Sequence, residues 1–235
     1  VDMASRHNRK QSRNENPRDD LLMAVGAYFK NDFGALQIDG DDKTLVCIQS
    51  GTVATTQEQT LDVGTYYVAT ITINSPTAIM AVGRNTIWST SRNASSTTFK
   101  ILGRYNGDTV PYYIFDPISS SVSDFGLQMF NASGTLTFDA LLPPMLILGA
   151  YTITTTGSIA TLPTGRTVAW IPGARGLSIR RSSDEAEINC RIPSYNSGSG
   201  LLTIADEGIF NLRSAGGADT PAEDFMLTVL DVTGI

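Results

Sequence analysis

The sequence predicts an all-β protein, and three of its features support this fold class. Charged residues make up only 17% of the chain, whereas about 25% is usual in soluble domains, and Ser, Thr, Asn and Gly are abundant instead. Short apolar segments are separated by Gly, Asn, Ser or Pro, as expected between strands. In residues 67–73 the side chains alternate with a period of two, as a half-buried strand requires.

The length of 235 residues suits either one large domain or two smaller ones. We expect two tandem antiparallel β-sandwich or jelly-roll-like modules, residues 23–122 and 123–235. An N-terminal arm, residues 1–22, precedes them, because this segment is polar and has almost no apolar residue to bury.

The arm carries five basic residues against four acidic ones, and three interpretations of it stay open. It is a flexible tail, an arm that orders against a neighbouring subunit, or a basic arm that reaches nucleic acid. The last is the weakest, because the arm is nearly neutral and the whole chain has a net charge of −6. The candidate contact residues are Arg6, Arg9, Lys10, Arg13 and Arg18.

In the first module the turn residues 39–42 lie between two apolar segments, which predicts a hairpin of strands 33–38 and 44–48. Further strands are expected over 65–73, 78–82, 86–89, 98–102 and 112–115.

The second module has the same texture, with a hairpin predicted from 125–131 and 135–139 around the turn 131–134. Further strands are expected over 145–148, 151–154, 167–171, 177–180, 187–192 and 225–231. Residues 201–204 are expected to form a strand, or else the start of a short helix over 201–212. The loop 195–200 contains Tyr195 and Asn196, which are candidate binding residues because exposed loops often carry contacts.

An Asp-Phe-Gly motif occurs twice and indicates duplication of one β-module. The alignment that starts from this motif pairs Leu45 with Leu136, and it also pairs Trp88 with Trp170 and Asp116 with Asp231. The motif residues are Asp32, Phe33, Gly34, Asp124, Phe125 and Gly126, which we expect to have structural roles in a strand and its bulge.

The residues that common catalytic sites need are scarce, so the sequence predicts no enzyme, no metal site and no cofactor. The single histidine, His7, lies in the arm, and no phosphate-binding glycine motif occurs. Cys47 and Cys190 are expected to be two small buried residues, or else a disulfide between the modules. The sequence contains no run of 18 apolar residues, so it predicts no membrane span.

The segment 124–139, Asp-Phe-Gly-Leu-Gln-Met-Phe-Asn-Ala-Ser-Gly-Thr-Leu-Thr-Phe-Asp, resembles a stretch of small tail proteins of siphovirus-like phages, encoded near the tail-tip and fibre genes. The preceding segment 113–117 is similar to the strand that often comes before it. The resemblance covers about 30 residues, with a weaker echo at 32–48. It implies a structural role at the distal tail of a virion, and it implies no catalytic residues.

We therefore expect a phage tail-tip or fibre-associated subunit that is assembled in the host cytoplasm into the virion. Its partners would be other virion proteins and further copies of itself, bound through many weak contacts that symmetry multiplies. One alternative is a receptor- or glycan-binding module on the virion. Another is a jelly-roll capsid or decoration protein with an internal arm.

Overall fold

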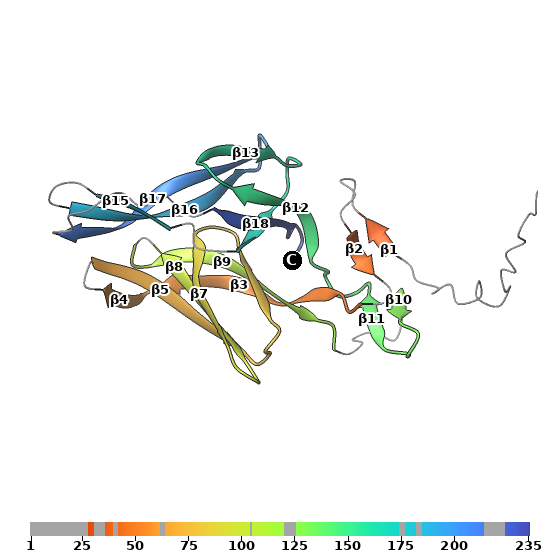
Figure 1. Cartoon of the computed structure of the whole chain (residues 1–235). Helices are drawn as coiled ribbons and strands as arrows, with labels where there is room; N and C mark the ends of the chain where they lie inside the picture. The colour runs from red at the N-terminus through yellow and green to blue at the C-terminus, as the bar shows by residue number, and fades with distance from the viewer. Residues whose placement is uncertain are drawn as a thin grey trace, which may run out of the picture.

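A computed structural model describes residues 28–30, 36–39, 42–61, 64–103, 105–119, 126–173, 177–181, 185–213 and 224–235 (Figure 1). Every regular element in these ranges is a β-strand, which confirms the predicted fold class. The same ranges contain no helix long and apolar enough to cross a membrane. The strands are β1 (Tyr28–Lys30), β2 (Leu36–Asp39), β3 (Leu45–Thr55), β4 (Gln57–Leu61), β5 (Gly64–Ile73), β6 (Ile79–Val82), β7 (Thr86–Arg92), β8 (Thr97–Gly103), β9 (Asp108–Pro117), β10 (Gln128–Phe130), β11 (Leu136–Asp139), β12 (Leu146–Ile153), β13 (Gly157–Thr161), β14 (Val168–Pro172), β15 (Leu177–Arg181), β16 (Glu185–Asn196), β17 (Leu201–Arg213) and β18 (Phe225–Asp231).

The strands form one central sheet, two outer sheets and two hairpins, all antiparallel. The central sheet has six strands in the order β12-β18-β14-β6-β9-β3. The outer sheets have four strands each, β4-β5-β8-β7 and β13-β17-β16-β15. The hairpins β1–β2 and β10–β11 lie at one end of the molecule, away from the outer sheets (Figure 1).

One hydrophobic core joins the two halves of the chain. It contains Met80 and Trp170 of the central sheet, Ile101 of the first outer sheet and Leu202 of the second, each at most 1% exposed. Strands β5 and β17 of the two outer sheets also contact each other. Both outer sheets therefore cover the same face of the central sheet, and the halves share a sheet as well as a core.

The opposite face of the central sheet carries a second apolar cluster. Phe115, Leu230 and Ala169 are fully buried there, next to the half-buried Cys47. Cys47 and Cys190 are both free thiols, and Cys190 is buried, so the two residues form no disulfide.

The two halves are related by an approximate two-fold axis at the centre of the sheet. Strands β6 and β14 meet there in antiparallel orientation through Val82 and Trp170. From this junction outward the order is β6-β9-β3 on one side and β14-β18-β12 on the other. Since equivalent strands occur in the same order and the junction is antiparallel, a half-turn about it superposes the two halves of the central sheet in strand order. The outer sheets differ in connectivity, because β5 precedes β6 in the chain whereas β17, at the matching place, follows β14.

Strand registers identify equivalent residues of the two halves. In the hairpins, Tyr28 pairs with Asp39 and Gln128 with Asp139, and both ladders shift register before their last pair. The spacing from 28 to 128 and from 39 to 139 is 100 residues. Strands β3 and β12 keep this spacing, and their ladders with β9 and β18 shift after residues 47 and 147. Asp116 and Asp231 occupy equivalent places, opposite residues 46 and 146.

These registers correct the predicted alignment of the repeats. Leu136 is equivalent to Leu36, not to Leu45, because Leu36 pairs with Lys30 and Leu136 with Phe130, each as the last pair of its hairpin ladder. Trp170 is equivalent to Met80 of β6, and Trp88 lies on β7 of an outer sheet. Similar short strings in β-rich sequences gave a plausible alignment whose phase was wrong.

Two local predictions are also wrong. The turn 39–42 does not close a hairpin, since β2 pairs with β1 and β3 pairs with β9. A turn signal shows that the chain bends and not which strand it will pair with. Residues 201–212 belong to a strand rather than a helix, because β17 pairs with β16 from Leu201 to Arg213.

Candidate interaction surface

The turn of the hairpin β10–β11 is held by the side chain of Asn131. Its side-chain oxygen Oδ1 accepts hydrogen bonds from the backbone N–H of Ser133 at 3.1 Å and of Thr135 at 2.9 Å. Gly134 has a φ of +77°, a conformation that glycine adopts without strain. The Asn-Ala-Ser-Gly sequence therefore fixes the turn by local bonds alone.

Asp139 terminates the hairpin and connects it to the rest of the chain. Its side chain is fully buried, where Oδ2 accepts from Gln128 Nε2 at 3.3 Å and Oδ1 from the Leu141 N–H at 3.0 Å. The equivalent residue of the first hairpin is also an aspartate, Asp39. In the second hairpin, the Asp139 carboxylate holds the first and last residues of the hairpin together.

Backbone hydrogen bonds attach the hairpin and the segment after it to β3. Thr44 donates to the carbonyl of Thr137, and Met145 donates to the carbonyl of Leu45, both at 2.8 Å. The hairpin is therefore anchored on the body of the protein, and its orientation is defined.

Four exposed apolar side chains gather on this hairpin and the segment that follows. The side chains of Leu127, Phe130, Leu141 and Leu146 are 54%, 53%, 52% and 37% exposed. They make up more than half of the large exposed apolar residues in the part of the chain that the structure describes. We call these four residues the hairpin patch.

The segment that carries the hairpin patch has almost no charge in its own sequence. Between residues 126 and 150 the sequence has one ionisable side chain, that of Asp139, and it is buried. Charged residues of other segments do lie near it, since Leu146 pairs with Asp231 and the exposed Lys43 precedes Thr44, which bonds to the hairpin. Soluble monomers seldom expose contiguous apolar patches of substantial size without a binding role. The hairpin patch is therefore a candidate contact surface for another macromolecule.

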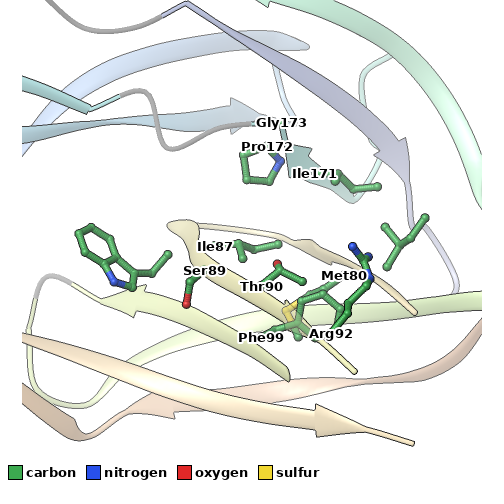
Figure 2. A pocket seen from close by; sticks show the side chains of 11 residues that line it. Met80, Ile87, Ser89, Thr90, Arg92, Phe99, Ile171, Pro172 and Gly173 are labelled. Carbon is green, nitrogen blue, oxygen red and sulfur yellow. The ribbon is translucent and has the colours of Figure 1, made fainter. Parts of the chain in front are cut away.

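A cavity of 410 Å³ lies where the two halves meet, between β6, β7 and β14. Figure 2 shows Ile171 and Pro172 facing Met80 and Ile87 across it. Arg92 also lines it, and its Nη2 donates to the Ala78 carbonyl at 3.0 Å. The lining contains no carboxylate, so the cavity offers apolar contact and shape rather than acid–base chemistry.

Of the predicted site residues, the structure describes Gly126, which directly precedes Leu127 of the hairpin patch, and Tyr195 and Asn196. Gly126 is described, and its φ of +107° makes it a conformational residue just before β10. Tyr195 and Asn196 end β16. The residues outside the described ranges are Arg6, Arg9, Lys10, Arg13, Arg18, Asp32, Phe33, Gly34, Asp124 and Phe125.

Tyr195 and Asn196 take part in the turn between β16 and β17. The Tyr195 hydroxyl donates to the Pro163 carbonyl at 2.5 Å, and its ring packs on the core. Asn196 Oδ1 accepts the N–H groups of Gly198 and Ser199 at 3.0 and 3.1 Å. Both side chains thus have structural partners within the chain.

Sequence reasoning missed the hairpin patch, although the sequence contains a signal for it. A 25-residue segment with one charge stands out in a chain that is 17% charged. Over the described residues there is no group of three or more His, Cys, Asp or Glu side chains placed to hold a metal ion. No protein-family model, no characterised protein and no solved structure matches this chain.

Proposed function

We propose that this chain is a structural subunit of a phage tail, at the tail tip or on a fibre, and that it acts by assembly with neighbouring proteins. The observation that carries the proposal is the hairpin patch. Two of its residues, Leu127 and Phe130, lie within the segment 124–139, whose sequence resembles phage tail proteins, and both are exposed. One segment therefore supports the proposal by sequence and by surface chemistry.

Comparison of the two repeats shows that the β-hairpin does not itself require these apolar residues. At the spacing of 100 residues, Leu127, Phe130 and Leu141 correspond to Ala27, Lys30 and Asp41 in the sequence. The two hairpins nevertheless have the same register. The apolar residues of the second hairpin therefore serve something other than its folding.

The hairpin patch has enough apolar surface to matter in binding. Complete burial of one Leu or Phe side chain contributes roughly 1.5–3 kcal/mol, and about half of each is still exposed. The four together offer several kcal/mol, part of which offsets the entropy lost on association. Such a contact is modest alone and becomes strong when a symmetric particle repeats it.

The test is to detect the protein in purified virions by mass spectrometry and then to replace residues of the hairpin patch. Phe130→Ser combined with Leu127→Ser should leave the fold intact and remove the protein from particles. The control is Tyr105→Ser, which changes a side chain that is 60% exposed and remote in the fold from this hairpin. Absence of the unaltered protein from particles would refute the proposal.

A receptor- or glycan-binding module on the virion is the second candidate, because of the cavity between the halves. Trp88 lines it, and the buried Tyr66 supports its ring at 5.2 Å between centroids in a tilted arrangement; a half-buried indole in a cavity is a surface of the kind that sugars bind. Binding on a glycan array that Trp88→Ala abolishes, without loss of the protein from particles, would favour this candidate.

A further inference from the structure

We propose that two copies of this chain associate edge to edge through β3, which extends the central sheet from one copy into the next. The contact is residues 48–54, which we call the open edge. This inference rests on the proposed assembly role and adds a partner, a second copy, and a geometry, antiparallel strand pairing. It uses a different surface from the hairpin patch.

The open edge is a long, exposed stretch of an edge strand. β3 is the last strand of the central sheet and pairs only with β9 among the described strands. Residues 48–52 and 54 are exposed, Val53 is half-buried, and the Ile48 side chain is 49% exposed. Exposure of consecutive residues means that neither face of residues 48–52 is buried, although the Tyr112 side chain lies beside Gly51.

Edge strands are normally protected against pairing by charged side chains, by proline or by their shortness. Three of the four edges of the outer sheets follow this rule: β4 carries Glu58, β7 carries Arg92, and β15 carries Arg180 and Arg181. The fourth, β13, has only five residues. β3 has eleven residues and neither a charge nor a proline, so it is the least protected long edge.

The other edge of the central sheet, β12, is less suited to pairing. A Cβ atom on Gly149 would lie 2.6 Å from the Tyr151 hydroxyl, so the tyrosine ring extends along this strand. The equivalent of Tyr151 in the first half, 100 residues earlier, is Gly51. The repeats have therefore diverged toward a small, open surface on β3.

A second copy is the partner that this edge fits best. Antiparallel self-pairing centred on Gly51 places Ser50 opposite Thr52, and Ile48 opposite Ala54, around a two-fold axis. No like charges meet, although each chain has a net charge of −6 that opposes association elsewhere. Glycine at the centre adds no side chain to the contact, and Tyr112 of the same copy lies over the face where its Cβ would be, 3.2 Å from that position.

The test is sedimentation equilibrium of the full chain, of Ser50→Lys and of the matched control Ser91→Lys. Ser91 is exposed on β7, so the control adds the same charge at an edge that is already charged. The unaltered chain and Ser91→Lys should be dimers. Ser50→Lys should weaken association at least about tenfold, because its lysine lies at a contact built from uncharged pairs.

Hydrogen exchange gives a second measurement that needs no variant. Dilution of the unaltered chain from dimer to monomer should speed amide exchange within residues 48–54 and leave β9 protected. The proposal is overturned if the unaltered chain is a monomer at high concentration, or if the Ser50→Lys variant stays dimeric. Either result indicates that the open edge binds something other than a second copy. Neither result tests the hairpin patch. That surface is tested separately, by the amount of the Phe130→Ser variant found in purified particles.

Discussion

Replacement of Trp170 by alanine tests whether the two halves form one cooperative unit. Trp170 is 1% exposed, sits at the β6–β14 junction opposite Val82, and belongs to the shared core. Its indole Nε1 donates to the Asn85 carbonyl at 3.1 Å. One side chain thus links the second half to the first through packing and through a hydrogen bond.

The expected loss in the free energy of unfolding is about 3–5 kcal/mol, as found for large aromatic residues in cores. About 1 kcal/mol of it comes from the Asn85 carbonyl, which loses its donor. For a chain of this size each kcal/mol lowers the melting temperature by about 2–4 °C, so the transition should fall by about 6–20 °C. Because sheet and core are continuous, one transition should move as a whole.

Calorimetry combined with near-ultraviolet circular dichroism measures both quantities. Trp88→Ala is the matched control, since Trp88 is half-buried on β7 and packs in a small separate cluster, so its loss should be smaller. Two transitions, of which only one shifts, would contradict the shared core. A loss below about 1 kcal/mol for Trp170→Ala would contradict its role at the junction.

Three further predictions concern single features of the fold. Arg191→Ala should destabilise by about 3–5 kcal/mol in urea unfolding, because this buried side chain donates to two carbonyls of the β12 end and pairs with Asp206 at 3.8 Å. Asn131→Ala should speed hydrogen exchange in β10–β11 only, since the turn loses its Oδ1 acceptor. Burial raises the pKa of the Cys47 thiol and of the Tyr113 hydroxyl, and the nearby Cys47 thiolate raises the pKa of Tyr113 further. Both groups therefore lose their protons at lower pH in the unfolded chain than in the folded one. The free energy of unfolding, measured in urea, should fall as pH rises above about 9.

Composition and local alternation were sufficient to predict the all-β class and much of the second hairpin. The turn at Asn131 and Gly134 depends on bonds between near neighbours, so a local signal contains it. The exposed part of β3 was missed beyond residue 48, because exposed residues on both faces leave no alternation to detect. β4 and β13 were missed for a similar reason, as short edge strands with few apolar residues.

Strand pairing across the chain could not be predicted from local patterns. The central sheet depends on contacts such as Val82 with Trp170 and Leu45 with Met145, which lie far apart in sequence. The alignment of the two repeats depends on the same ladders, because the register shifts that the two halves share identify the equivalent residues. The hairpin patch required exposure as well as sequence, since an apolar residue such as Phe130 is by default expected in a core.

The two proposed contact surfaces lie at positions where the two repeats differ in sequence. At the hairpin tip, the apolar residue is in the second repeat, Phe130, and its equivalent in the first repeat is Lys30. On the edge strands, the open residue is in the first repeat, Gly51, and its equivalent in the second is Tyr151. Each of the two proposed contact surfaces therefore occurs in one repeat and not in the other. Under the two proposals, the edge strand binds a second copy and the hairpin patch binds a different neighbour, so the two contacts can be tested separately.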